Sequence, residues 1–271
     1  MVNIILCRKD FKMIKLIASD IDGTLLDDEK GLPENFDEVM DILDKKGITF
    51  CVASGRSYAA LQEMFSKYLK KISFICDNGA YLVNEGENVF VSVMDKQGVK
   101  DIVKFCNENN LQPILCGKKG TWHCMKKEEN HKEVKQYYNN QLYVENLLEC
   151  DDDIFKIAVF EETGIENDGY PKLLEKFGDK FNPQISGKFW CDIMNKGINK
   201  GVGLQRLQKN LSVTYEETMA FGDFLNDSPL LENAYYSYAV ANAHPKLKEI
   251  ANFTTGSNNE NSVMKEILAH I

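Results

Sequence analysis

The apolar and polar positions at the start of the chain alternate between short strands and amphipathic helices. Residues 14–19 form an apolar run that predicts a buried strand. Apolar residues then recur at i, i+3, i+4 and i+7, which predicts a helix that begins at Pro33. Residues 48–53 and 74–76 predict two more buried strands, with a second amphipathic helix between them. This β-α-β-α-β order favours a parallel sheet with helices on its faces.

The pattern changes after Gly79. Residues 80–83 and 89–93 predict a hairpin, because two strand-like runs are joined through a short polar turn. Shorter strands and helices follow, among them a polar helical stretch near residues 131–138. This segment therefore predicts an α+β arrangement that differs from the first part of the chain.

From Lys200 onwards the strand and helix alternation returns. We therefore expect an α/β fold with a doubly wound, Rossmann-like parallel sheet. The core domain is discontinuous, at residues 1–84 and 190–271, and an inserted α+β domain occupies residues 85–189. Ligands of open parallel sheets bind at the carboxyl ends of the strands, so we expect the functional residues directly after the predicted strands.

The first predicted strand ends in two carboxylates. Asp20 and Asp22 lie two residues apart and lead into Gly23, whose freedom allows a sharp bend. A nucleophile at that bend would be exposed to a ligand, and two nearby carboxylates can divide labour, one ionised and one protonated. An Asp-rich turn or a helix cap is the alternative for this pattern taken alone.

Two further junctions carry groups that suit a phosphate. Ser54 and Gly55 follow the second predicted strand and precede a helix N-terminus, which favours anions. A serine before a helix is also a common N-cap. Lys200 stands before the next helix of the core and would supply one positive charge, although most lysines are solvated surface groups.

The strand predicted at residues 218–221 is followed by a fourth polar group. Asp223, Asn226 and Asp227 lie within six residues and offer hard oxygen ligands of the kind that suit Mg²⁺. An Asx-rich loop is the alternative. The four groups are more specific together than separately, because each stands where the alternation predicts a cleft.

These segments resemble the haloacid dehalogenase-like superfamily, and within it the Cof-type (type IIB) phosphatases. The resemblance rests on ASDIDGTLL, ASGR, CDNGA, GINKG, FGDFLNDSPLL and ANAHPKLKEIA. It covers most of the predicted core and the length and position of the insert. By this resemblance the insert is a cap that closes over the cleft and carries specificity.

The resemblance also implies roles. Asp20 aligns with the nucleophile that forms an aspartyl-phosphate, and Asp22 with the general acid that later acts as base. Asp20, the backbone carbonyl of Asp22 and Asp223 would hold Mg²⁺. The remaining positions would bind phosphate (Ser54, Gly55, Lys200 and Asn226), support the metal site (Asp227) and line the cleft (Asn78). Electrostatics support these roles. A phosphomonoester carries about two negative charges and would be repelled by the carboxylates, so Mg²⁺ and a lysine are needed beside them.

Composition limits the class of partner. The 271 residues carry a net charge of −9, so an extended nucleic-acid interface is not expected. No apolar run is long enough for a membrane span, and the start does not read as a signal peptide. The eight cysteines form no CxxC pair and predict reduced thiols in a cytoplasmic protein. We expect the partner to be a small phosphorylated metabolite, such as a sugar phosphate. We expect the protein itself to be a monomer or a weak homo-oligomer.

Some positions depart from the family pattern, and other functions stay open. Ala241 replaces a usual glycine, and Phe224 stands where a small residue is common. Trp122 and His123 could face a substrate, or be a half-buried aromatic and a surface histidine. The leading hypothesis is a phosphatase, and the alternatives are a phosphomutase or a metabolite-binding regulator with little turnover.

Overall fold

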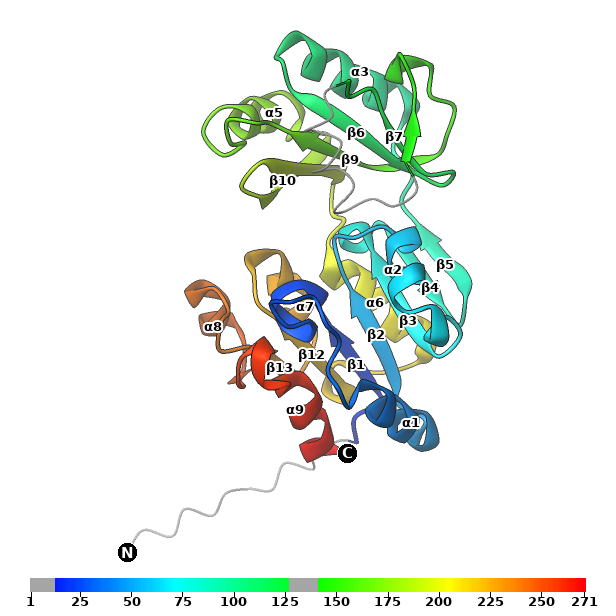
Figure 1. Ribbon diagram of the computed structural model, residues 1–271, viewed down its shortest axis with the longest axis vertical. Coiled ribbons are helices and arrows are strands. Elements are labelled where there is room, and N and C mark those ends of the chain that lie inside the picture. The colour runs from blue at the N-terminus through cyan, green and yellow to red at the C-terminus, as the bar shows by residue number, and fades with distance from the viewer. Residues whose placement is uncertain (1–12, 127–140) are drawn as a thin grey trace, which may run out of the picture. The chain divides into compact units, whose positions relative to one another are not determined.

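The computed structural model describes residues 13–126 and 141–271, so the helical stretch predicted near residues 131–138 lies outside the described residues. The chain forms two compact units, Met1–Phe50 with Gln208–Ile271 and Cys51–Leu207 (Figure 1). The chain enters the second unit within β2 (Thr49–Ala53) and leaves it within α6 (Lys200–Leu211).

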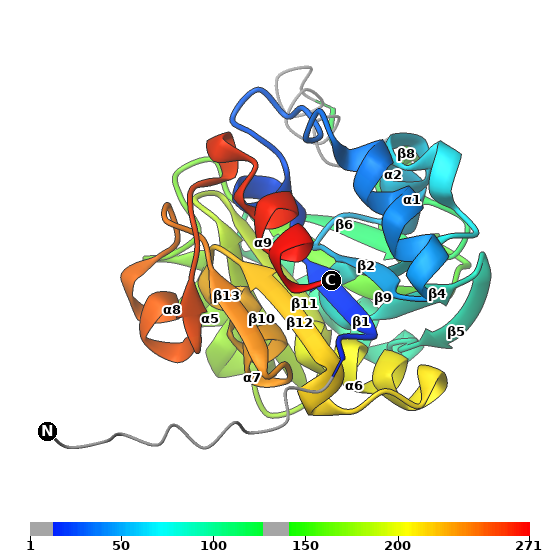
Figure 2. The same cartoon turned by 90° about the horizontal axis from the view of Figure 1, so that it is seen from below.

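The first unit is built on a parallel sheet in the order β14-β13-β12-β1, and Figure 2 shows β13, β12 and β1 side by side. Ser19 lies opposite Phe221 in the β1–β12 pair, and Gly222 lies opposite Ala239 in the β12–β13 pair. Strands β1 and β12 are buried along their whole length, which explains their unbroken apolar sequence. The strands are β1 (Leu16–Ser19), β12 (Thr218–Gly222), β13 (Tyr236–Ala239) and β14 (Phe253–Thr254).

The helices of the first unit cover this sheet with their apolar sides. Helix α1 (Phe36–Lys46) buries Val39, Met40 and Leu43, as the spacing predicts, and ends at Gly47 with a positive φ of 66°. The ring of Phe36 meets Phe50 edge-on at 5.9 Å. The other helices are α7 (Ser228–Glu232), α8 (Pro245–Ile250) and α9 (Ser262–His270).

The second unit contains the predicted hairpin and a six-stranded sheet. Strand β4 pairs antiparallel with both β3 and β5, and the six-stranded sheet has the order β10-β11-β9-β6-β7-β8. The first group is α2 (Tyr58–Met64), β3 (Ile72–Cys76), β4 (Tyr81–Asn84) and β5 (Glu87–Val91). The second sheet consists of β6 (Gln112–Gly117), β7 (Thr121–His123), β8 (Gln141–Tyr143), β9 (Ile154–Phe160), β10 (Phe181–Gly187) and β11 (Trp190–Asn195).

The two faces of the six-stranded sheet have different neighbours. Helices α3 (Lys96–Glu108) and α5 (Gly169–Phe177) cover one face (Figure 1), and their buried residues form one apolar cluster with that face. The other face packs around Ala80 and Tyr81, and the rings of Tyr81 and Phe155 lie 5.6 Å apart. Each face of the sheet therefore carries an apolar cluster, one covered by helices and the other by the turn before β4.

The predicted α/β class with a parallel sheet is confirmed. The six-stranded sheet extends past residue 189, because β11 pairs with both β10 and β9, while the domain boundary after residue 189 stays a prediction. The boundary at residue 85 stays a prediction. Strands β8 and β14 were not predicted, because both are short and β14 is exposed, so neither carries an apolar signal.

Two further observations concern the described residues. None of their helices is long and apolar enough to cross a membrane. The described cysteines are free thiols, and most of them are buried, as expected from their apolar surroundings. Burial raises the pKa of the Cys106 thiol to about 12, which keeps it protonated and unreactive at neutral pH.

Candidate functional site

The first unit gathers three carboxylates at one end of its sheet. One oxygen from each of Asp20, Asp223 and Asp227 lies within 4.8 Å of the others. The cause is the sheet itself, because β1 and β12 are parallel neighbours and their chains leave at the same edge. The amide of Asp20 still donates to the carbonyl of Phe221 at 3.1 Å, which holds the two chain ends together beyond the strands.

The donor set of this cluster fits a hard divalent cation. Asp20 and Asp227 are buried and Asp223 is half-buried, so the three acidic groups are largely withdrawn from water. Carboxylate oxygens are the ligands that Mg²⁺ takes from proteins, usually together with several waters. Thr24 donates to Asp223 Oδ1 at 3.2 Å and so orients that carboxylate. The residues present therefore suit Mg²⁺.

Asp227 also holds the loop that carries Asp223. Its Oδ2 accepts the backbone amides of Asp223 at 3.1 Å and Phe224 at 3.2 Å, and its side chain is fully buried. A Cβ on Gly222 would lie 2.6 Å from the Cβ of Asp227, so only glycine fits there. Asn226 lies half-buried in the same short turn, Leu225–Asp227. This geometry suits a supporting residue better than an open ligand.

Asp22 lies on the same loop as Asp20, but its carboxylate is not part of the described three-carboxylate cluster. Its Oδ1 accepts from Lys30 Nζ at 3.0 Å, and the side chain is 37% exposed. Gly23 has a positive φ of 79°, and a Cβ there would lie 2.5 Å from Asp223 Oδ2. The bend after Asp22 thus packs closely against Asp223, which explains the glycine of the motif.

The second unit holds three of the four residues expected at the phosphate, Ser54, Gly55 and Lys200, whereas Asn226 belongs to the first unit. Ser54 is buried, and its Oγ accepts the amide of Arg56 at 3.1 Å. The amide of Asn78 donates to the carbonyl of Ser54, and the amide of Asp77 donates to that of Arg56, both at 3.0 Å. The turn with Ser54 and Gly55, after β2, is therefore joined to the turn with Asn78, after β3.

Lys200 belongs to the same neighbourhood. It is the first residue of α6 and is 1% exposed. The side chain of Asn199 accepts the amide of Val202 at 2.9 Å and caps the helix. A Cβ on Gly79, whose φ is 96°, would overlap the carbonyl oxygen of Asn199. The turn with Asn78 and Gly79 therefore packs directly against the start of α6, so Ser54, Asn78 and Lys200 come from three adjoining segments.

Two asparagines that sequence reasoning assigned no role hold the loop after β1. Asn242 Nδ2 donates to the carbonyl of Gly23 at 2.7 Å, and Asn242 Oδ1 accepts the amide of Asn258 at 3.1 Å. Asn258 Nδ2 donates to the carbonyl of Leu26 at 3.1 Å. The bonds to Gly23 and Leu26 span 219 and 232 residues of sequence, so local pattern could not reveal them.

Sequence reasoning also missed Lys156 and two aspartates. Lys156 Nζ lies 3.0 Å from Asp77 Oδ1 and 3.5 Å from Asp192 Oδ2, and it donates to the carbonyl of Gly55 at 2.8 Å. Lys156 and Asp192 were detectable, because each interrupts an otherwise apolar strand: IFKIAVF and WCDIM. A charge in such a run needs a buried partner.

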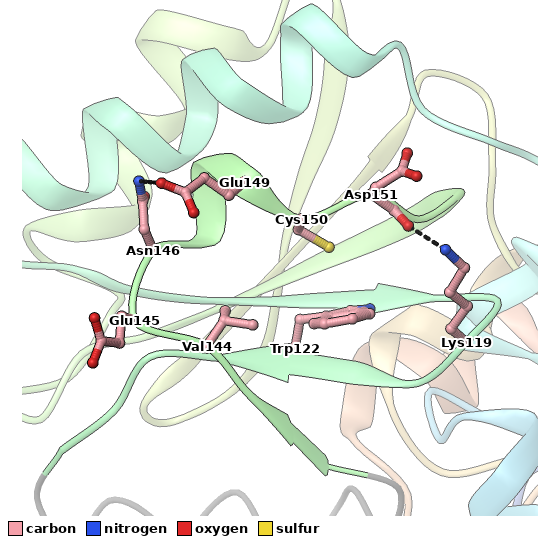
Figure 3. Close-up of a pocket in the computed structure, with 8 residues that line it drawn as sticks. All are labelled: Lys119, Trp122, Val144, Glu145, Asn146, Glu149, Cys150 and Asp151. Atoms are coloured by element: carbon pink, nitrogen blue, oxygen red, sulfur yellow. Dashed lines mark hydrogen bonds between the residues drawn. The ribbon is translucent and has the colours of Figure 1, made fainter.

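A cavity of about 550 Å³ lies on the insert, lined on one side by the Trp122 ring and by Val144 (Figure 3). Trp122 is half-buried and donates to Asp152 Oδ2 at 2.9 Å, whereas His123 is 2% exposed, so the surface histidine considered above is wrong. The lining carries more carboxylates than cations, because it includes Glu145, Glu149 and Asp151 but only one lysine, Lys119. That charge repels phosphate, so this cavity is no candidate for the phosphate site.

Comparisons with known proteins identify the family of this chain. A family model described as haloacid dehalogenase-like hydrolase matches residues 17–267. The chain is 32% identical over 257 residues to the 5-amino-6-(5-phospho-D-ribitylamino)uracil phosphatase YbjI of Escherichia coli (strain K12), covering 94% of this chain and 95% of that protein.

Two further relatives extend the comparison. The 5-amino-6-(5-phospho-D-ribitylamino)uracil phosphatase YitU of Bacillus subtilis is 25% identical over 260 residues, covering 92% of this chain and 95% of that one. The crystal structure of SMU.1108c from Streptococcus mutans superposes with a TM-score of 0.88 at 28% identity, covering 94% and 98% of the two chains.

Proposed function

Because this chain belongs to the haloacid dehalogenase-like hydrolases and is a phosphatase, we propose that it hydrolyses small phosphorylated metabolites with Mg²⁺, through an aspartyl-phosphate on Asp20. The observation that carries the proposal is the cluster of Asp20, Asp223 and Asp227, whose oxygens lie within 4.8 Å of one another. A nucleophilic carboxylate inside a cation-binding group is what this chemistry needs, because the attacking oxygen and the phosphate are both anionic.

Each proposed step belongs to a residue of this chain. A carboxylate oxygen of Asp20 attacks the phosphorus in line with the ester oxygen, and the bond to that oxygen breaks. Asp22 gives its proton to the leaving oxygen. It then takes a proton from the water that attacks the phosphorus of the aspartyl-phosphate, which releases inorganic phosphate and restores Asp20. When bound, Mg²⁺ would neutralise part of the charge shared by the carboxylates and the phosphate.

We assign phosphate binding to Ser54, Gly55, Lys200 and Asn226. Lys200 would contribute a positive charge, and the hydroxyl of Ser54 a hydrogen bond to a phosphate oxygen. Asp227 would hold the loop of Asp223, as its two amide contacts support, and Asn78 would line the cleft. These roles follow from the family and from the local geometry within each unit.

The relatives narrow the choice of substrate. Two of them, at 32% and 25% identity, are named as phosphatases of 5-amino-6-(5-phospho-D-ribitylamino)uracil. We propose the same chemical class for this chain, a phosphorylated sugar or polyol that carries a ring. A panel of phosphorylated metabolites with this compound as its first member tests the assignment, and equal rates on all members would contradict it.

The reaction itself is tested with purified protein and p-nitrophenyl phosphate. Turnover should stop after chelation with EDTA and return on addition of Mg²⁺. Asp20→Asn should abolish it, whereas Glu38→Gln, which removes an exposed carboxylate on α1, should not. One phosphate released for each substrate consumed distinguishes hydrolysis from a mutase, which returns the phosphoryl group, and from binding without turnover. Full activity of Asp20→Asn would disprove the proposed role.

A further inference from the structure

A buried charged triad in the second unit is not used by the proposed chemistry. It consists of Lys156, Asp77 and Asp192, which are 1%, 0% and 4% exposed. Lys156 comes from β9 and Asp192 from β11, two central strands of the six-stranded sheet, whereas Asp77 follows β3. The triad therefore joins the insert to a turn that also carries Asn78.

A buried charged triad is energetically unfavourable compared with an apolar core. Withdrawing each charge from water costs several kcal/mol, and apolar side chains of similar volume are often as stabilising as a buried ion pair. Burial raises the pKa of Asp77 from 3.8 to about 6, although Lys156 beside it acts in the opposite direction. A role other than stability is thus indicated.

The hydrogen bonds of the triad end on the two turns assigned to the phosphate. Lys156 Nζ donates to the carbonyl of Gly55 at 2.8 Å, next to Ser54. Asn78 Nδ2 donates to Asp192 Oδ2 at 3.0 Å, while the amide of Asn78 donates to the carbonyl of Ser54 at 3.0 Å. Lys156 and Asp192 thus hold both turns from the side of the insert.

The turn after β3 needs such support. Asp77, Asn78 and Gly79 have successive positive φ values of 48°, 52° and 96°. Left-handed backbone is unfavourable for residues other than glycine, and two such residues in succession persist only where the surroundings hold them. Here Lys156 pairs with the side chain of Asp77, and Asp192 with that of Asn78.

We propose that Lys156 is a positioning residue for phosphate binding: with Asp77 and Asp192 it holds the Gly55 carbonyl, and through it the Ser54 hydroxyl and the neighbouring amides, in the geometry that receives a phosphate. This inference rests on the proposed function, because that function assigns Ser54 to the phosphate. It adds that β9 and β11 of the insert help to order the two turns assigned to the phosphate.

The test compares Lys156→Met, which removes the charge and all donors, with Lys172→Met. Lys172 is an exposed lysine of α5 whose ion pair with Asp168 is at the surface. On p-nitrophenyl phosphate, Lys156→Met should lower kcat/KM by up to about 100-fold and weaken inhibition by inorganic phosphate, since small misplacements of positioning groups have effects of this size. Lys172→Met should match the wild type. Wild-type kinetics for a folded Lys156→Met protein would overturn the inference.

A double-mutant cycle with Ser54→Ala distinguishes a positioning role of Lys156 from a general structural effect of its substitution. If Lys156 acts through the Ser54 turn, adding Lys156→Met to Ser54→Ala should change kcat/KM by less than about threefold. Two effects that multiply in the double variant would overturn the inference. Asp192→Asn keeps the shape of the side chain and serves in place of Lys156→Met should that protein fail to fold, with the same expected direction.

Amide hydrogen exchange gives a readout that needs no turnover. In Lys156→Met the amides of residues 54–57 and 77–79 should exchange several-fold faster, while those of β12 in the first unit should not change. Unchanged exchange at both turns would overturn the inference even where the wild type is an active phosphatase. Conversely, an inactive wild type would overturn the proposed function, and the exchange result would still decide whether Lys156 holds the turns.

Discussion

Two charged clusters among the described residues, one in each unit, differ in what they contain. The first unit gathers Asp20, Asp223 and Asp227, all acidic, whereas the second places Lys156 between Asp77 and Asp192. Acidic groups held close together attract a cation, while a lysine between two carboxylates supplies its own compensation. The first arrangement therefore suits ligand binding and chemistry, and the second suits holding structure.

The largest expected effect comes from removing one carboxylate of the first cluster, that of Asp20. Asp20→Asn should lower turnover of p-nitrophenyl phosphate by about 10³-fold or more, because it removes the attacking carboxylate. The same change removes one of three mutually repelling carboxylates, so in EDTA its melting temperature should equal or exceed that of the wild type. A variant that is inactive and also clearly less stable in EDTA would mean that Asp20 has mainly a structural role.

The matching change in the second cluster should have the opposite effect on stability. Lys156→Met leaves Asp77 and Asp192 buried without their shared cation, which should lower the free energy of unfolding by about 3–5 kcal/mol. Urea denaturation followed by circular dichroism measures this, with Lys172→Met as the surface control. A loss below about 1 kcal/mol would show that the triad is compensated in another way.

A pH titration sharpens the comparison further. The pKa of Asp77 in the folded chain, about 6, lies above its ordinary value of 3.8, so the folded chain binds this proton more tightly than the unfolded chain. The contribution of Asp77 to stability is then fully present below pH 3.8 and is lost as pH rises through 6. Lys156 on β9 and Asp192 on β11 face this carboxyl and modulate the effect.

Asp77→Asn isolates this contribution. Between pH 4 and 7 the wild type should lose on the order of 1–3 kcal/mol of unfolding free energy relative to Asp77→Asn, measured by denaturation at each pH. Parallel stability curves for the two proteins would contradict the raised pKa. The first cluster offers no equivalent test, because its carboxylates are expected to bind metal.

The smallest expected effect concerns Lys30, which pairs with Asp22 at the surface. The pair is 3.0 Å long, and its side chains are 59% and 37% exposed, so it should contribute only about 0–1 kcal/mol. Lys30→Ala should change turnover by no more than a few-fold. A loss as large as that of Asp20→Asn would place Lys30 in the catalytic machinery.

The sequence predicted what depends on local pattern and on the rules of parallel sheets. The apolar runs at β1 and β12 and the spacing in α1 were enough for these elements, and the strand-end rule pointed to Asp20 and Asp223 before their proximity was known. It did not reveal β8 and β14, which are short, or the contact of Asn242 with Gly23, which lies 219 positions away.

What the sequence determined by itself is thus the α/β pattern and the carboxylates that leave its strands, because periodicity and strand ends are properties of neighbouring residues. Only the tertiary structure decided that Lys156 contacts Gly55 and Asp77. Gly55 lies 101 positions away from Lys156 in the sequence. A buried charge selects its partner by distance in space, and that distance exists only once the strands of the insert have paired.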